Sequence, residues 1–319
     1  MADDSPLSPA STSAAPEVEN DDTLDFFEDS LGSLFNEHMP AAGDPLKLYT
    51  YTPPGGALPL TCRIPPQQVN SLFAHHVWSA SLRMADALSE RRLVVEGEDV
   101  LEMGAGAGIP GLVAARMGAR RIVLSDYDDT ALIANLKANV SLAYPDAPET
   151  RSRLKAVGHS WGEEPSLQAL LSANDSSSFT HILLADTLWY SDGHSLLLSS
   201  LVRLLAHTPT ARIHICAGFH SGRATVRNFL RKARAVGLVP RGAWEEVGVK
   251  GERREWGWDV RRAAAAGAEG AGEAGDAEDQ WIEEEDTSER NKWVVEGSLG
   301  WGNDLLREAD GREGIADER

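Results

Sequence analysis

The chain has 319 residues, 42% of them hydrophobic, with a formal net charge of −19 and two cysteines. This length and apolar content are enough for one large α/β core with appendages. No stretch reaches the roughly 18 apolar residues of a membrane span, and the acidic N-terminus lacks the layout of a secretory signal. The two cysteines form neither a disulfide framework nor a metal-ligand pattern, so we expect no bound metal. We therefore expect a reducing compartment: the cytoplasm or, as an alternative, the nucleus.

The negative charge is concentrated in three segments. Residues 1–30, 263–289 and 302–319 carry −9, −10 and −3, so against the total of −19 the rest of the chain carries +3. Acidic blocks that are poor in apolar residues are usually disordered. We predict a disordered N-terminus over 1–22, a disordered insertion over 263–289 and a flexible tail over 302–319. Nucleic acid is disfavoured as a partner, and we expect a monomer.

The first predicted elements form an N-terminal extension over residues 23–70. Apolar residues at helical spacing predict a short amphipathic helix over 24–34. Two alternating runs between Leu46 and Ile64 flank the turn Pro53-Pro54-Gly55-Gly56, which predicts a β-hairpin. The pattern then becomes helical from Ser71 to Leu88.

Residues 71–301 are the predicted main domain, in which strands and helices alternate. The predicted strands are 99–103, 121–125, 153–158, 180–185, 211–217, 243–249 and 292–299. The predicted helices are 110–117, 129–142, 165–173, 193–206 and 222–236. This alternation predicts an α/β fold, a Rossmann-like sheet of seven strands with helices on both faces. Ligands of such sheets bind at the carboxyl ends of the strands.

A glycine-rich run directly follows the first of these strands. It reads Glu102-Met103-Gly104-Ala105-Gly106-Ala107-Gly108. Glycines at alternate positions let the backbone turn sharply and approach a ligand closely. The acid at the strand end can accept a hydrogen bond from an amine or hydroxyl of that ligand. This pattern is expected where S-adenosylmethionine binds to a nucleotide-binding sheet, and it points to methyl transfer.

The same run has a second interpretation as a dinucleotide fingerprint. Gly106-x-Gly108-x-x-Gly111 fits G-x-G-x-x-G, and Asp126 at the end of the next strand would bind ribose hydroxyls in either case. However, Glu102 stands where a dehydrogenase would have its first glycine. Pro110 also lacks the N–H that a pyrophosphate would use. These features favour the methyl donor, with a nicotinamide or flavin enzyme as the alternative.

Later strand ends carry further candidates for chemistry. Asp186 ends the fourth strand, where it would attract the sulfonium, orient an incoming amine and accept a proton. Trp189 and Tyr190 would form walls of the methyl-transfer site, because aromatic faces favour cationic groups. Hydrophobic packing is the alternative role of these two residues. His220, after the fifth strand, is a weaker candidate for substrate contact.

The motifs together resemble those of the seven-β-strand methyltransferases of the lysine-methyltransferase-like group. The resemblance runs from about Phe26 to Trp301 and is carried by Phe27–Phe35, Phe73–Trp78, Glu102–Gly108, Ser125–Tyr127, Gly158–Gly162, Ala185–Trp189 and Ala217–His220. It extends to fungal members labelled nicotinamide N-methyltransferases and to an elongation factor 1A methyltransferase. It implies an S-adenosylmethionine pocket lined by Trp78, Glu102, Gly104, Gly106, Asp126, Trp161 and Ala185. We expect Ala105 and Gly108 of the glycine-rich run to bind the cofactor as well. Trp161 would pack on the adenine ring, or else fill the core at a loop corner.

The methyl acceptor stays open at this stage. The acid-x-x-aromatic motif of the group usually ends in Phe or Tyr, whereas the matching position here is Trp189. We expect an N-methyltransferase acting on a protein lysine or N-terminal amine, with a translation factor as one candidate substrate. The alternatives are a small-molecule, nicotinamide-type N-methyltransferase and a non-catalytic adaptor that kept the fold.

Overall fold

The computed structural model describes residues 41–66, 74–248, 250–257 and 287–306. The chain divides into two units, and all described residues lie in the second, Met39–Arg319. The predicted disordered N-terminus and the helix over 24–34 lie outside the described residues. So do most of the acidic insertion and most of the C-terminal tail.

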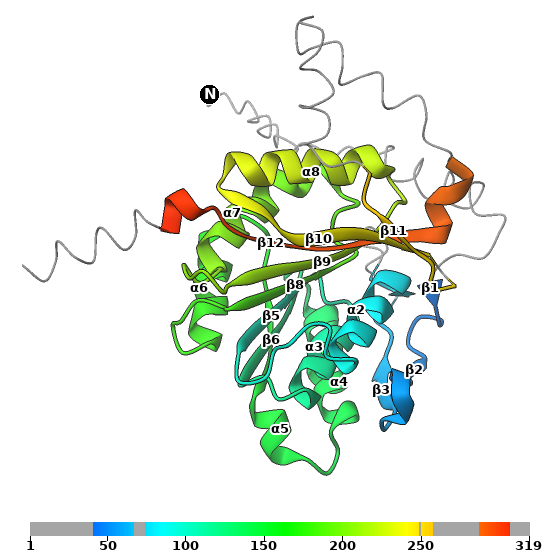
Figure 1. Cartoon of the computed structure of the whole chain (residues 1–319). Coiled ribbons are helices and arrows are strands. Elements are labelled where there is room, and N and C mark those ends of the chain that lie inside the picture. The colour runs from blue at the N-terminus through cyan, green and yellow to red at the C-terminus, as the bar shows by residue number, and fades with distance from the viewer. Residues whose placement is uncertain (1–40, 67–73, 249, 258–286, 307–319) are drawn as a thin grey trace, which may run out of the picture. The chain divides into compact units, whose positions relative to one another are not determined.

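The core of the described unit is a mixed sheet of eight strands (Figure 1). In spatial order they are β11 (Arg253–Glu255), β10 (Leu238–Gly248), β12 (Trp293–Trp301), β9 (Arg212–Gly218), β8 (His181–Ala185), β5 (Asp99–Met103), β6 (Arg121–Asp126) and β7 (Leu154–Gly158). The five strands from β9 to β7 are parallel, whereas β12 runs antiparallel to both β9 and β10. Seven of the strands correspond to the predicted ones, and the three-residue β11 adds an eighth at the edge.

The strand order reverses between β5 and β8. The chain passes from β5 to β6 and β7 on one side and then returns to place β8 on the other side of β5. At such a reversal the connections leave in opposite directions, which opens a crevice at the carboxyl ends of the strands. The antiparallel β12 between β9 and β10 sets this sheet apart from the six-stranded order of dinucleotide-binding sheets.

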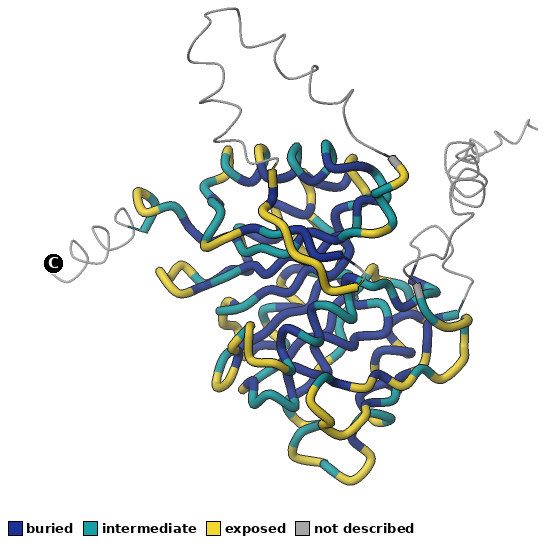
Figure 2. Tube along the Cα trace, turned by 45° about the vertical axis from the view of Figure 1, so that its right-hand side comes forward, coloured by how far each residue is buried: buried dark blue, intermediate teal, exposed yellow. Residues whose placement is uncertain are grey.

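Helices cover both faces of the sheet, as predicted. They are α2 (Ser79–Ser89), α3 (Ile109–Arg116), α4 (Thr130–Ala143), α5 (Pro148–Ser152), α6 (Glu164–Ala173), α7 (His194–Leu204) and α8 (Arg223–Ala235). The first three pack on one face, and α6, α7 and α8 pack on the other (Figure 1). Successive strand residues point to opposite faces, so Val100 joins one core and Leu101 the other. Figure 2 shows the strands buried between these layers.

None of the described helices is long and apolar enough to cross a bilayer.

The predicted hairpin is present as β2 (Leu48–Tyr51) and β3 (Leu60–Arg63). Asn139 on α4 connects this hairpin to the rest of the domain by hydrogen bonds. Its Oδ1 accepts the Arg63 N–H at 2.7 Å, and its Nδ2 donates to the Arg63 carbonyl at 2.8 Å and to the Ala107 carbonyl at 2.9 Å. A single buried amide thus joins the hairpin, α4 and the glycine-rich run.

Two predicted boundaries are wrong. The helix expected from Ser71 begins at Ser79, because β4 (Val77–Trp78) pairs with β1 (Ala41–Ala42) and holds Trp78 extended; residues 71–73 lie outside the described part. β10 begins at Leu238 rather than 243. Pro240 and Gly242, which usually interrupt strands, lie in the part of β10 that does not pair with β11. They lie next to a register shift in the pairing of β10 with β12, between Arg241 and Glu245, where a strand tolerates them. The short elements α5 and β11 were not predicted.

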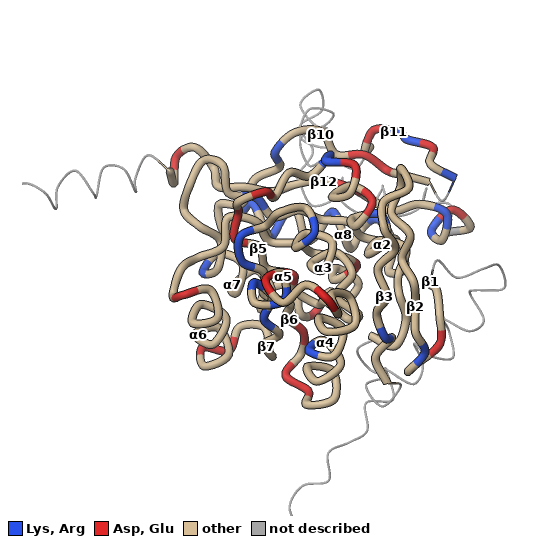
Figure 3. The backbone as a smooth tube through the Cα atoms, turned by 90° about the horizontal axis from the view of Figure 1, so that it is seen from below, with Lys and Arg blue, Asp and Glu red and all other residues tan. Residues whose placement is uncertain are grey.

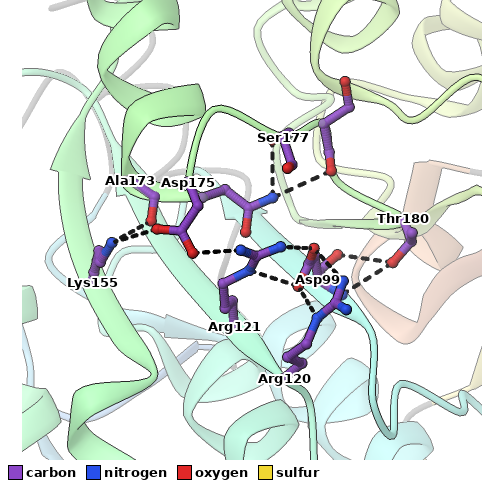
Figure 4. Close-up of polar contacts among 10 residues, drawn as sticks. Asp99, Arg120, Arg121, Lys155, Ala173, Asp175, Ser177 and Thr180 are labelled. Atoms are coloured by element: carbon purple, nitrogen blue, oxygen red, sulfur yellow. Dashed lines mark hydrogen bonds and ion pairs between the residues drawn. The ribbon is translucent and has the colours of Figure 1, made fainter.

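The amino ends of the strands carry an ionic cluster at the edge away from the crevice (Figure 4). Asp99 is 2% exposed and accepts two hydrogen bonds from Arg120, at 2.9 and 2.7 Å, and two from Arg121, at 3.0 and 2.6 Å. Burial alone would raise the pKa of Asp99, but the two guanidinium groups outweigh burial and lower it. Elsewhere in the described unit, charged residues of both signs are interspersed (Figure 3).

Candidate active site

The glycine-rich run forms a loop after β5 in which three glycines have left-handed backbones. The φ angles of Gly104, Gly106 and Gly108 are 68°, 53° and 79°, which other residues rarely adopt. A Cβ at Gly104 would lie 2.6 Å from Cγ2 of Thr187. A Cβ at Gly106 would meet only the Ala74 carbonyl oxygen, at 3.9 Å. The loop is therefore packed tightly at Gly104 and has space at Gly106, where a ligand could approach the backbone.

Glu102, at the end of β5, is hydrogen-bonded to the start of α3. Its side chain is buried, and Oε2 accepts the Gly111 N–H at 2.8 Å. Burial raises the pKa of Glu102 to about 8, although the Gly111 N–H favours the charged form. Because Pro110 has no N–H and Gly111 donates to Glu102, the start of α3 is poorly equipped to bind a pyrophosphate. This favours the methyl donor over a dinucleotide. A direct contact of Glu102 with the cofactor stays a prediction.

Asp126 lies beside the glycine loop at the end of β6, as predicted. Its Oδ2 accepts the Gly106 N–H at 2.6 Å and its Oδ1 accepts the Tyr127 N–H at 2.7 Å. Burial raises the pKa of Asp126 to about 6. Each carboxylate oxygen can accept a second hydrogen bond. Asp126 is therefore positioned by the loop and can still accept a ribose hydroxyl.

Asp186 lies at the end of β8 in a strained left-handed backbone with φ of 60°. Its side chain is buried, and each carboxylate oxygen already has a partner. Oδ1 accepts the Gly218 N–H at 2.8 Å, and Oδ2 lies 3.1 Å from Nε2 of His220. The Trp78 ring lies 5.0 Å from the His220 ring. The structure thus joins Asp186, His220 and Trp78 at the carboxyl ends of β8 and β9.

Three predicted aromatic residues gather at the start of α7. A Cβ at Gly193 would lie 2.5 Å from Cδ1 of Tyr190 and 3.2 Å from Cζ3 of Trp161. The rings of Trp189 and Tyr190 are 5.7 Å apart, and Tyr190 is 47% exposed. Both Trp161 and Trp189 are partly buried. Their contacts with the cofactor or the acceptor remain predictions, as does that of the buried Ala185.

Sequence reasoning missed two residues of this region. Thr187 is 4% exposed, and its hydroxyl has no hydrogen-bond partner among the described residues. Such a group costs stability unless something satisfies it. The methyl group of the same side chain lies beside Gly104, which places Thr187 next to the glycine loop. Its place directly after Asp186 was the available signal. Asn139 gave no signal, because it lies within an ordinary helical pattern.

A pocket of about 200 Å³ lies at a different place, between the end of α2 and strands β9, β10 and β12. Its polar lining includes Arg92, His214, Arg253 and Glu296. None of the predicted site residues lines it. We therefore assign the candidate active site from the glycine loop and the strand reversal.

The glycine loop, Asp126 and the unsatisfied Thr187 hydroxyl suit a ligand with hydroxyl groups and without a phosphate. The strand reversal between β5 and β8 makes this an α/β sheet of the kind whose ligands bind at the carboxyl ends of the strands. A family model described as lysine methyltransferase matches residues 61–235, more than half of the chain. The chain belongs to this family, which confirms the resemblance seen in its motifs.

Named relatives agree with the family. The chain is 33% identical over 152 residues to a protein N-terminal and lysine N-methyltransferase of Schizosaccharomyces pombe, an alignment covering 47% of this chain and 58% of the relative. It is 31% identical over 182 residues to the protein of that name in Yarrowia lipolytica, covering 52% and 64%. The chain thus spans about six tenths of the length of these relatives. A solved ribosomal protein L11 methylase from Lactobacillus delbrueckii subsp. bulgaricus matches at 12% identity with a TM-score of 0.37, covering 69% of this chain and 78% of that one.

Proposed function

We propose that this protein is a S-adenosylmethionine-dependent N-methyltransferase whose acceptor is a protein amine, either a lysine side chain or an N-terminus. The single observation that carries the proposal is the arrangement at the strand reversal. The open glycine loop with Asp126 lies on one side of it, and the buried acid Asp186 ends the neighbouring strand. The lysine methyltransferase family and the names of the two relatives support the same activity.

The residues of this site fit the cofactor. When bound, S-adenosylmethionine supplies an electrophilic methyl group on a positively charged sulfur. Gly106 leaves space for it, and Asp126 is available to the ribose hydroxyls. The Thr187 hydroxyl would gain the hydrogen bond that it lacks in the described residues. The remaining predicted lining residues are Trp78, Glu102, Gly104, Ala105, Gly108, Trp161 and Ala185.

The acceptor side of the site is assigned to Asp186, Trp189 and Tyr190. Asp186 would orient the incoming nitrogen through its buried charge, and the two aromatic rings would contact the acceptor and limit the entry of water. Such residues accelerate the reaction by fixing the reacting atoms in line and by excluding solvent.

The proposal is tested by incubating the full chain with labelled S-adenosylmethionine and a dialysed host-cell lysate to which nicotinamide is added. We expect label in the acid-precipitated protein fraction, on lysine or N-terminal nitrogen after hydrolysis. Label in methylnicotinamide alone would show that the acceptor is a small molecule. A folded protein that binds S-adenosylmethionine and labels neither fraction would support the adaptor alternative.

Among protein substrates, a translation factor is the one to test first, because the motifs resemble those of an elongation factor 1A methyltransferase. We further infer a monomer acting in the cytoplasm. Mass spectrometry of the labelled band would identify the acceptor, and light scattering during size-exclusion chromatography would measure the oligomeric state.

A further inference from the structure

The loop after β7 is anchored on both sides of Trp161, the residue predicted to pack on the adenine ring. On one side, the His159 N–H donates to the Asp126 carbonyl of β6 at 2.8 Å. On the other side, the Gly162 N–H donates to the hydroxyl of Ser200 on α7 at 2.9 Å. The backbone of Trp161 is therefore held between β6 and α7.

The ring of His159 joins this loop to two helices. It is 1% exposed, and both of its nitrogens have a partner. Nε2 lies 2.8 Å from Oγ of Ser200 on α7, and Nδ1 lies 2.8 Å from Oγ of Ser166 on α6. Ser200 is also buried. A side chain enclosed in this way acts by holding its neighbours in place, which requires no access from solvent.

These contacts fit a neutral ring with its proton on Nδ1. A serine hydroxyl has one proton to donate, and the Ser166 hydroxyl donates to the Glu163 carbonyl at 3.2 Å. Oγ of Ser166 then accepts from Nδ1–H of His159. Nε2 accepts the proton of Ser200, whose oxygen still accepts the Gly162 N–H. Burial lowers the pKa of His159 to about 4, so the ring keeps this neutral form near pH 7.

The anchored loop lies beside the acid that is predicted to bind ribose. Gly158 of β7 pairs with Asp126 of β6, and Oδ2 of Asp126 accepts the Gly106 N–H of the glycine loop. Adenine is bonded directly to ribose, so a base whose ribose is bound by Asp126 must lie close to this strand end. Trp161 comes three residues after Gly158 and is partly exposed, so its ring can contact the base.

We propose that His159 is a positioning residue of the cofactor site: through its contacts with α6 and α7 it fixes the loop in which Trp161 packs on adenine. This role rests on the proposed function, because it requires S-adenosylmethionine as the cofactor. His159 itself does not touch the cofactor. An aromatic ring that is fixed before the ligand arrives loses less conformational freedom on binding, so the affinity is higher than with a loosely held loop.

The main test is calorimetric titration of the full chain and of Ser200→Ala with S-adenosylmethionine. The substitution removes the acceptor of the Gly162 N–H and the partner of Nε2, in a helix that tolerates alanine. Stacking of a base on an aromatic ring changes affinity by roughly 5- to 150-fold, and we expect Ser200→Ala to lose part of this, about three- to tenfold. Ser199→Ala, at an exposed position of the same helix, is the matched control and should bind like the wild type.

A double-mutant cycle separates positioning of Trp161 from a purely structural role. His159→Ala should weaken S-adenosylmethionine binding by roughly tenfold in the wild-type background. In the Trp161→Ala background it should change affinity by less than about twofold, because the contact that it supports is already gone. If His159→Ala does not fold, Ser200→Ala takes its place in the cycle.

The control for lost stability is His214→Ala. This buried histidine on β9 also has a partner on each ring nitrogen, His181 at 2.8 Å and Ser298 at 2.9 Å, and it lies outside the candidate site. Urea unfolding should give a lower midpoint for both His214→Ala and His159→Ala. Only His159→Ala should also bind S-adenosylmethionine more weakly per folded molecule.

Four results would overturn this role of His159, each in a different way. If the wild type binds S-adenosylmethionine and both His159→Ala and Ser200→Ala bind it equally well, the network is structural only, although the proposed function stands. Unchanged affinity in Trp161→Ala would show that Trp161 fills the core instead of packing on adenine. Equal losses from His159→Ala in both backgrounds would mean that the network acts on another part of the site. A wild type that does not bind S-adenosylmethionine would overturn the proposed function as well.

Discussion

Asp186 has a backbone conformation that costs a non-glycine residue about 1–3 kcal/mol. The surroundings hold it there: its N–H donates to the Cys216 carbonyl at 2.8 Å, and its carboxylate is bound by Gly218 and His220. Sequence reasoning placed Asp186 at a strand end and expected an acid there. It did not find the partnership with His220, because the two residues are 34 positions apart and meet only when β8 pairs with β9.

Gly106→Val should block cofactor binding. The valine would combine an unfavourable φ of 53° with a branched side chain in the open space of the loop. Gly97→Val is the matched control, because Gly97 has φ of 78° and has nothing within 4 Å of a built Cβ, whereas a Cβ at Gly106 meets only the Ala74 carbonyl oxygen at 3.9 Å. We expect both variants to lose comparable stability, while only Gly106→Val loses calorimetric S-adenosylmethionine affinity. Equal affinity in the two folded variants would place the cofactor elsewhere.

Glu102 should make the free energy of unfolding fall as pH rises. Its pKa is about 8 in the folded chain, against about 4.3 in an unfolded one. Between these values the folded state holds a proton that the unfolded state has lost, so stability falls as pH increases through this window. Glu102→Gln cannot ionise and can still accept the Gly111 N–H. Its stability relative to wild type should therefore rise from pH 5 to pH 8, by on the order of 1–3 kcal/mol.

Urea unfolding at pH 5, 6, 7 and 8 measures this effect as a difference between pH values, so that any constant cost of the substitution cancels. Glu98→Gln, just before the same strand, is the control. If Glu102→Gln and wild type change in parallel over this range, Glu102 is already ionised in the folded protein.

At the scale of elements, the fold positions the glycine loop through its neighbours. The Ala105 N–H donates to the Ser125 carbonyl of β6 at 3.0 Å, and the Ala107 carbonyl accepts from Asn139 of α4. α4 (Thr130–Ala143) is in turn capped by Asp129, whose carboxylate accepts the Ala131 and Leu132 N–H groups. Such caps are readable from sequence, because an aspartate before a helical pattern is a strong N-terminal signal.

Asn139→Ala should weaken the loop and the hairpin together. It leaves the Arg63 N–H, which is partly buried, and the Ala107 carbonyl, which is buried, without their partner, and an unsatisfied buried group costs about 1–3 kcal/mol. We expect a lower urea midpoint and a several-fold weaker S-adenosylmethionine affinity, because the loop loses one of its supports. Lys137→Ala, on the exposed side of the same helix, should change neither quantity. Lost stability with unchanged affinity would confine Asn139 to holding the hairpin.

At the scale of the whole domain, the sheet has its candidate site at the carboxyl ends of its strands and its ionic cluster at the amino ends. The cluster links the starts of three neighbouring strands (Figure 4). The N–H of Asp99, the first residue of β5, donates to the hydroxyl of Thr180, which directly precedes β8, at 3.1 Å. Arg121, the first residue of β6, also contacts Asp175 at 2.5 Å. Stability and ligand binding are thus assigned to opposite edges of one sheet.

Asp99→Asn should reduce stability without changing cofactor affinity per folded molecule. The lowered pKa of Asp99 means that its stabilisation is present above the unfolded pKa of about 3.9 and is lost as pH falls through the lower folded value. We expect a loss of about 1–3 kcal/mol near pH 7, discounted because Arg120 is largely exposed. The difference from wild type should disappear in strong acid. Asp175→Asn, which removes an exposed partner, should cost less in urea unfolding at pH 7.

The sequence by itself determined the alternation of strands and helices, the glycine-rich turn and the acids at strand ends. These features depend on local periodicity and on backbone conformations that only glycine adopts readily. Tertiary structure alone decided that Glu102 faces α3, that Asn139 supports the loop and that His220 lies on Asp186. Each of these contacts joins residues from different elements, so it depends on strand order and register, which local sequence patterns do not encode.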